Sequence, residues 1–127
     1  MKIYYAHHLW KYGTEIEAWE LELIRQHFPE CEIINPNGVI EQGRPSEDIM
    51  TDCLRKVIEC DAVVFSTLSG VIGKGVFQEL VEAVSLGRPI YCIQRGEIIT
   101  ESCIRLKLLN PPPSDRHYAV IYEERSF

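Results

Sequence analysis

The sequence predicts an α/β fold in which helices cover both faces of a parallel sheet. Apolar runs rich in β-branched residues recur along the chain, and the clearest, residues 61–68, is typical of a strand buried on both faces. Amphipathic segments with helical spacing separate these runs. Such an alternation requires right-handed crossovers and therefore parallel strands. For a sheet of this size the economical order is 2-1-3-4-5, with the topological switch point between the first and third strands.

The first elements are defined by a strand, a capped helix and a second strand. Residues 2–6 form the first strand, and residues 14–28 form a helix that the capping box Thr14-x-x-Glu17 opens. Residues 31–34 form the second strand, which the turn sequence Asn35-Pro36-Asn37-Gly38 ends. The apolar face of the helix is expected to consist of Ile16, Trp19, Leu23, Ile24 and Phe28.

The alternation continues after a loop over residues 39–45. Ser46 is expected to cap a second helix, residues 61–68 form the third strand, a third helix runs to Gly87 and residues 88–93 form the fourth strand. The tail is read as a short helix over residues 100–109 and an edge strand over residues 117–122, while the prolines at 111–113 exclude a helix there. The buried stripe of the second helix is expected to contain Ile49, Met50, Cys53, Leu54, Val57 and Ile58.

The composition fits one domain over residues 1–127 and excludes several classes of partner. A net charge of −6 and a pI near 5.2 argue against polymeric nucleic acid, whose phosphates need clustered Lys and Arg. Every apolar run is shorter than a membrane span, so we expect a soluble cytoplasmic protein without membrane contact. The five cysteines lack C-x-x-C spacing and are read as reduced core residues, and no metal site or cofactor is predicted.

A glycine loop that leads into the third helix is the best functional clue. The segment Gly73-Lys74-Gly75 precedes Glu79, and it follows the third strand, where ligands bind in open parallel sheets. The crevice is expected to collect Tyr4 or Tyr5 with His7 and His8 from the first strand and its loop, together with Asn35, Ser66, Gly73, Lys74 and Gly75. A Glu near a helix N-terminus also simply complements the helix dipole, and Lys74 is read either as a phosphate ligand or as a solvated loop residue.

Several common chemistries lose support in this sequence. No Walker motif passes through the glycine loop, no Gly-x-Gly-x-x-Gly follows the first strand, and no Gly-x-Ser-x-Gly elbow is present. A carboxylate, aromatic hydroxyls and small polar groups around a ring-sized pocket remain. That set is suited to glycosyl chemistry, in which a carboxylate attacks the anomeric carbon and an acid assists the leaving group.

Four motifs in register over residues 2–95 carry a resemblance to a known family. They are Ile3-Tyr4-Tyr5-Ala6, Asn35-Pro36, Cys60-Asp61-Ala62-Val63-Val64, and Gly75-x-x-x-Glu79 followed by Ala83 and Gly87-Arg88-Pro89-Ile90. The chain resembles the nucleoside 2-deoxyribosyltransferase family, which includes relatives that hydrolyse nucleoside monophosphates. The resemblance implies a flavodoxin-like three-layer sandwich, a nucleoside or nucleotide substrate, and homo-oligomers whose sites borrow residues from a neighbour.

The resemblance also implies roles for three residues and exposes two departures. Glu79 takes the place of the nucleophile that forms a glycosyl-enzyme intermediate, Tyr4 that of the tyrosine orienting it, and Asp61 that of an aspartate heading the third strand. Cys53, with Asp52 beside it, and Gly73 stand where the family carries acids. His7, His8 or a neighbouring subunit's carboxylate would then have to serve.

Three readings of the function follow. The first is an enzyme that cleaves or exchanges an N-glycosidic bond through Glu79. The second is a noncatalytic nucleotide-binding or sensor domain that keeps the crevice, which the missing acids would permit. A receiver-like phosphoacceptor is weakly supported, because the first strand ends in Ala6-His7-His8 where an acidic pocket would be needed.

Overall fold

The computed structural model describes residues 1–100, 104–108 and 117–122. Its main sheet has the order β2-β1-β3-β5-β6. Strands β2, β1, β3 and β5 run parallel, and β6 runs antiparallel to β5. The predicted α/β class and mostly parallel sheet are therefore confirmed. The five strands are β1 (Lys2–Ala6), β2 (Glu32–Ile34), β3 (Ala62–Ser66), β5 (Ile90–Gln94) and β6 (Glu97–Thr100).

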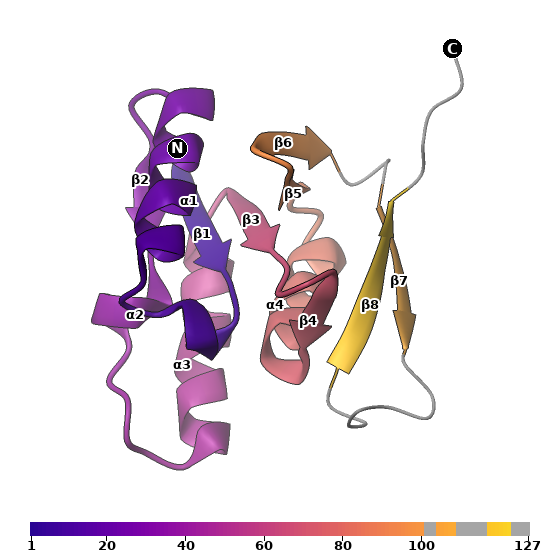
Figure 1. Ribbon diagram of the computed structural model, residues 1–127. Helices are drawn as coiled ribbons and strands as arrows, with labels where there is room; N and C mark the ends of the chain where they lie inside the picture. Colours follow the sequence, from indigo (N-terminus) through magenta and orange to yellow (C-terminus); the bar gives the residue numbers. More distant parts are fainter. Residues whose placement is uncertain (101–103, 109–116, 123–127) are drawn as a thin grey trace.

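Helices pack on both faces of this sheet, as expected. The long helices are α1 (Glu15–His27), α3 (Ser46–Glu59) and α4 (Lys74–Ser85), and two short ones, η1 (Leu9–Lys11) and α2 (Pro36–Val39), follow β1 and β2. Tyr4 and Val63 pack in a core with residues of α3 and α4, whereas Tyr5 and Val64 pack in a second core with α1. The sheet thus lies between α1 on one side and the α3–α4 pair on the other (Figure 1).

The predicted apolar face of α1 is only partly correct. Thr14 does cap the helix, since its hydroxyl accepts the Glu17 N–H at 3.2 Å. Ile24 is buried, but Ile16 and Trp19 are each 52% exposed, while Glu17 and Glu20 face the sheet. The physical reason is that the adjoining sheet face and the loop after β1 present hydroxyl, imidazole and ammonium groups, which pair with carboxylates.

Helix α3 follows the prediction except at its ends. It begins at Ser46, but no side chain caps it and Pro45 occupies the cap position. Cys53 and Val57 are buried as expected, whereas Ile58 is 47% exposed. The last apolar residue of the predicted stripe therefore faces solvent.

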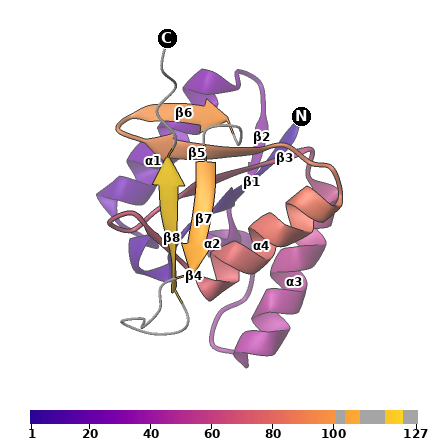
Figure 2. The ribbon, with the colours of Figure 1, turned by 90° about the vertical axis from the view of Figure 1, so that its right-hand side faces the viewer.

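The predictions for the tail are partly wrong. Thr100 and residues 104–108 do not form the helix predicted over residues 100–109, because Thr100 ends β6 and β7 spans Ile104–Leu108; residues 101–103 and 109 lie outside the described residues. Residues 117–122 do form a strand, β8 (His117–Tyr122), but it belongs to a second sheet of order β4-β8-β7, in which β4 is Val71–Gly73. This second sheet lies beside α4, on the side that Figure 2 turns toward the viewer. The prolines at 111–113 and Cys103 lie outside the described residues.

A tight hairpin explains the antiparallel strand β6. Only Arg95 and Gly96 join β5 to β6, and both have positive φ, 51° and 76°. Two consecutive residues in this conformation form the turn whose twist matches that of antiparallel strands. The chain therefore reverses directly after β5 instead of crossing over through a helix.

Candidate functional site

A cavity of about 420 Å³ opens at the carboxyl ends of the parallel strands. The segment after β1 supplies His7, His8, Leu9 and Tyr12 to its wall, and the loop before α3 supplies Gln42. Helix α3 adds Ser46, Ile49, Met50 and Cys53, and the opposite wall is the start of α4 with Gly73, Lys74, Gly75, Val76 and Glu79. The location agrees with the rule that open α/β sheets bind ligands beyond the carboxyl ends of their strands.

Glu79 is the central polar group of this cavity. Glu79 is only 5% exposed, and the Tyr4 hydroxyl donates a hydrogen bond to its Oε2. The expected contact between Glu79 and a tyrosine of the first strand is therefore present, and the partner is Tyr4. Tyr4 itself is fully buried behind the cavity wall, where strand alternation directs it toward α3 and α4.

Burial controls the protonation of both groups. Desolvation raises the pKa of Glu79 to about 8, and the hydrogen bond from Tyr4 opposes that rise. Burial, reinforced by the nearby Glu79 carboxylate, raises the pKa of Tyr4. The Tyr4 hydroxyl therefore stays protonated and donates the hydrogen bond, and Glu79 carries a proton at neutral pH.

The remainder of the wall is mostly apolar and has a rim of small polar groups. Ile49, Met50 and Val76 form a hydrophobic surface beside Glu79, which is the one carboxylate among the described residues lining the cavity. Burial, followed by the field of Glu79, raises the pKa of the Cys53 thiol, so the thiol stays protonated. A flat apolar ring with a reactive carbon near Glu79 would fit this chemistry.

Of the two glycines before Glu79, Gly75 allows close packing at the cavity, whereas a side chain at Gly73 would make an ordinary contact. A Cβ on Gly73 would lie 3.6 Å from Cδ2 of His8, and one on Gly75 would lie 3.2 Å from Cε of Met50. Lys74 lies between them, exposed at the mouth of the cavity. Gly73, Lys74 and Gly75 therefore lie on the wall that carries Glu79, and His8 packs against this wall at Gly73.

Four other predicted site residues lie elsewhere. Asp61 precedes β3 and its carboxylate accepts the Lys2 N–H at 2.8 Å, so it sits at the amino ends of the strands, remote from the cavity. Asn35 caps α2 by accepting the Asn37 N–H at 3.0 Å. Tyr5 and Ser66 point to the α1 face of the sheet. Strand alternation points Tyr5 to the face of the sheet opposite to Tyr4. Asp61 cannot reach the cavity, because it precedes its strand and the cavity lies at the carboxyl ends of the strands.

A buried polar cluster on the α1 face was missed by the sequence reasoning. Lys11 Nζ lies 3.1 Å from Oε2 of Glu20, and their side chains are 6% and 5% exposed. Tyr5 and Ser66 also donate to Glu20 Oε1, at 2.5 and 2.7 Å, and Lys11 donates to the Ser66 hydroxyl at 2.9 Å. This cluster holds the loop after β1, whose other side lines the cavity. Ser66, a polar residue at the end of a buried strand, was the only sequence signal for it.

A second polar cluster fixes His7. Nε2 of His7 lies 2.7 Å from Glu17 Oε2, and Nδ1 lies 3.2 Å from the Tyr5 carbonyl oxygen. Asn37 and the Gly13 N–H donate to the same Glu17 carboxylate. Burial lowers the pKa of His7, whereas the hydrogen bond to Glu17 opposes this shift. His7 therefore links the loop after β1 to α2 and is a structural member of the cavity wall.

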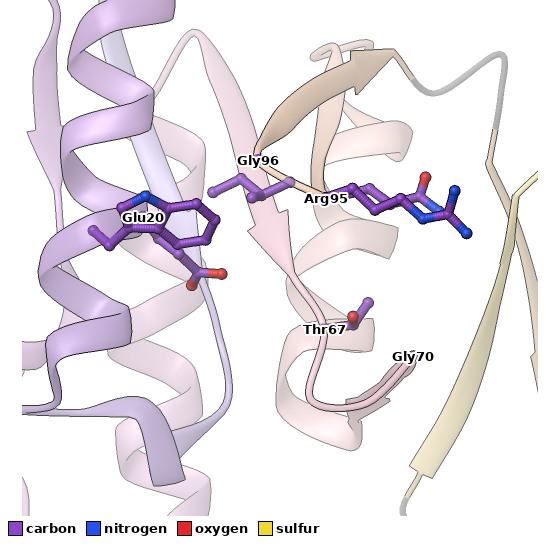
Figure 3. Close-up of a pocket in the computed structure, with 8 residues that line it drawn as sticks. Glu20, Thr67, Gly70, Arg95 and Gly96 are labelled. Atoms are coloured by element: carbon purple, nitrogen blue, oxygen red, sulfur yellow. The ribbon is translucent and has the colours of Figure 1, made fainter.

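A second hollow of about 490 Å³ lies on the other face of the sheet, between α1 and the β5–β6 turn. Its lining includes Glu20, Thr67, Gly70, Arg95 and Gly96 (Figure 3). Arg95 extends away from Glu20, whose carboxylate already pairs with Lys11, so the hollow offers no converging charged groups. The first cavity is therefore the better candidate site.

No group of three or more His, Cys, Asp or Glu residues is placed to hold a metal ion in the part of the chain that the structure describes. Within the same residues, none of the helices has both the length and the apolar character that a membrane span requires.

Two comparisons with known proteins identify no family for this chain. A scan against models of protein families gives no match, and a search of curated proteins gives none either. The resemblance to the nucleoside 2-deoxyribosyltransferase family therefore stays a prediction.

Proposed function

We propose that this chain is a flavodoxin-like domain of the nucleoside 2-deoxyribosyltransferase type, which cleaves or exchanges the N-glycosidic bond of a nucleoside or nucleoside monophosphate. The observation that carries the proposal is the buried Glu79, which receives a hydrogen bond from Tyr4 at the wall of an apolar cavity. The strand order β2-β1-β3-β5 also fits this fold, because the cavity lies at the switch point between β1 and β3.

The proposed reaction balances without a cofactor. An ionised Glu79 oxygen bonds to the anomeric carbon, the carbon–nitrogen bond breaks, and its electron pair goes to the base. Glu79 must lose a proton before it attacks, and the departing base takes one up, so this half-reaction needs no net proton. Water or a second base then displaces Glu79 from the sugar, which gives hydrolysis or transfer.

We expect base release to depend on the ionisation of Glu79. In the wild type kcat/KM should rise with pH and level off above about pH 8, because burial raises the pKa of the nucleophile to about 8. Tyr4→Phe removes the hydrogen bond that lowers this pKa, so the inflection should move to higher pH. The measurement is base release, followed by absorbance or chromatography at about ten pH values between roughly pH 5.5 and 10.

Tyr91→Phe is the matched control, since Tyr91 packs against Phe28 on the α1 side of the sheet. Its profile should equal that of the wild type. A rate that falls with rising pH would instead indicate that Glu79 donates a proton, and an unchanged inflection in Tyr4→Phe would contradict the assigned role of Tyr4.

Binding without catalysis is the second candidate function. It is favoured by the single carboxylate among the described lining residues, because glycosidases of both stereochemical types generally use two. Titration calorimetry with nucleosides and monophosphates, run beside base-release assays with and without an acceptor base, separates the two. Measurable binding with no release from any substrate would favour the sensor.

A homo-oligomer is expected if the site borrows an acid from a neighbour. The described cavity has no second carboxylate, and closed symmetric association is the common way to complete such a site. Sedimentation at micromolar concentration should therefore give a mass above 14.7 kDa. A monomer that still releases base would show that no borrowed residue is needed.

A further inference from the structure

Tyr12 brings a second aromatic hydroxyl group to the cavity, in addition to that of Tyr4. It follows η1 directly, is half-buried and lines the same cavity as Glu79. The Tyr12 hydroxyl makes no hydrogen bond with the part of the chain that the structure describes, whereas every fully buried polar side-chain atom of that part has a partner. The hydroxyl is therefore open to the cavity and can bind a ligand there.

The backbone around Tyr12 is fixed on both sides. The preceding residue, Lys11, forms the buried ion pair with Glu20. The following residue, Gly13, donates its N–H to the Glu17 carboxylate at 3.1 Å. Both neighbours of Tyr12 are thus anchored to α1, and this part of the loop is in place before a ligand binds.

The ring of Tyr12 packs against the ring of His7. The two ring centroids are 4.8 Å apart, and the ring planes lie at 40° to each other. His7 is itself held by the ion pair with Glu17 and by stacking on Tyr5, at 3.8 Å between centroids. A side chain that packing already orients loses little conformational freedom when its hydroxyl binds a ligand.

The Tyr12 hydroxyl keeps its proton and is a hydrogen-bond donor. Burial raises the pKa of Tyr12, and the charges of Glu79, Cys53 and Glu17 raise it further. Because such charge effects fall off with distance, the influence of Glu79 agrees with its place in the same cavity. A neutral, preorganised donor stabilises an acceptor that gains negative charge during a reaction.

Two groups carry negative charge in the proposed reaction. The first is the ionised Glu79, which already receives a hydrogen bond from Tyr4. The second is the departing base, which takes the electron pair of the broken bond. Glu79 is the one carboxylate among the described lining residues, so no second carboxylic acid of that wall assists the base. The base is therefore the acceptor that a donor at Tyr12 would stabilise.

We propose that Tyr12 binds the leaving base, its hydroxyl donating a hydrogen bond to a ring nitrogen or carbonyl oxygen of a purine or pyrimidine. As the carbon–nitrogen bond breaks, its electron pair goes to the base, and the hydrogen bond from Tyr12 strengthens. The proton stays on the Tyr12 oxygen, and the base takes its own proton from water. This inference rests on the proposed N-glycosidic function.

Replacing Tyr12 by Phe removes the hydroxyl and keeps the ring. The free energy of unfolding, measured with urea, should equal that of the wild type, because the hydroxyl bonds to none of the described residues. We expect kcat for an unmodified nucleoside to fall by about 10²-fold. Tyr91→Phe, which removes a hydroxyl from the α1 side of the sheet, is the matched control and should change neither quantity.

A nitrophenyl glycoside tests the cause of that loss, because its leaving group needs no assistance. Tyr12→Phe should release nitrophenol at the wild-type rate, and equal losses on both substrates would overturn the role of the hydroxyl. Tyr12→Leu removes the ring as well. Full activity of Tyr12→Phe on the nucleoside, with a loss only in Tyr12→Leu, would show that the ring acts by packing and would overturn the hydrogen bond while leaving Glu79 chemistry intact.

Binding of free adenine and cytosine, measured by calorimetry, distinguishes failure of this inference from failure of the proposed function. If the wild type releases no base but Tyr12→Phe binds the free bases several-fold more weakly than the wild type and Tyr91→Phe do, the base contact stands and the reaction does not. If the wild type releases no base and its affinities equal those of Tyr12→Phe, or it binds neither base, both the contact and the reaction are overturned.

Discussion

Replacing Glu79 by Gln is expected to abolish base release while leaving the fold intact. The amide has the same volume and can still accept the Tyr4 hydrogen bond, but it cannot form the glycosyl ester. We expect kcat to fall by about 10³-fold or more, as for other removed nucleophiles. The measurement is base release from nucleosides and monophosphates, with circular dichroism to check the fold.

The same variant should be more stable than the wild type at neutral and alkaline pH. Folding raises the pKa of Glu79 from 4.5 to about 8. Between pH 4.5 and pH 8 the folded protein therefore binds more protons than the unfolded chain. The free energy of unfolding of the wild type therefore falls as the pH rises through this window. Glu79→Gln removes the decline, and the gain at pH 8 should be about 4 kcal/mol.

Urea unfolding at pH 5 and pH 8 measures this effect, and Glu82→Gln on the same helix is the control. The control should show the wild-type pH dependence and normal base release. Full turnover by Glu79→Gln would exclude the nucleophile, and an unchanged pH dependence of stability would show that Glu79 is ionised in the folded protein. Turnover and the pH dependence of stability are measured independently, so the role of Glu79 as nucleophile and its raised pKa can each be contradicted without the other.

Replacing Lys11 by Met is expected to produce the largest loss of stability. The substitution leaves Glu20 buried without its counter-ion, and breaking one partner of a buried pair costs about 3–5 kcal/mol. Because the cluster anchors the loop that carries His8 and Tyr12, ligand affinity should fall as well. Urea unfolding and calorimetric titration with nucleotides measure the two effects.

A double variant tests whether the uncompensated charge is the cause. Lys11→Met with Glu20→Gln keeps an acceptor for the Tyr5 and Ser66 hydroxyls and leaves no buried charge in this cluster, so most of the stability should return. Arg25→Met breaks an exposed pair with Glu22 and should cost less than about 1 kcal/mol. If Lys11→Met has a free energy of unfolding no lower than that of Arg25→Met, the buried pair is not important for stability.

The main sheet could be predicted because each of its parallel strands has a recognisable pattern in its own short stretch of sequence. Residues 61–68 form a short apolar run, and β3 lies within it, buried throughout. The Thr14 cap and the glycine loop before Glu79 are equally local, since each depends on residues a few positions apart. With right-handed crossovers these signals were sufficient for the parallel order β2-β1-β3-β5 and for the position of Glu79 at the end of the strands.

The tail could not be read in this way because strand pairing is not local. Strand β8 pairs with both β4 and β7, and β4 is forty-four residues before it in the register that joins Gly73 to His117. A propensity scale contains no information on such partners, so residues 104–108 could be read as a helix. The turn at Arg95 and Gly96 is a local feature that makes β6 antiparallel to β5. The alternation of strands and helices before it favoured another crossover through a helix at this point.

Periodicity and turn chemistry act between neighbours in the chain, so they are enough to predict an α/β sheet with a glycine loop and Glu79 at its carboxyl edge. Contacts between distant elements determine that Tyr4 and not Tyr5 contacts Glu79, that Asp61 stands at the opposite edge, and that Glu17 and Glu20 turn inward. Those outcomes depend on which polar groups meet across the sheet. A buried carboxylate is stable only where donors from other elements converge, and no spacing along the chain encodes that convergence.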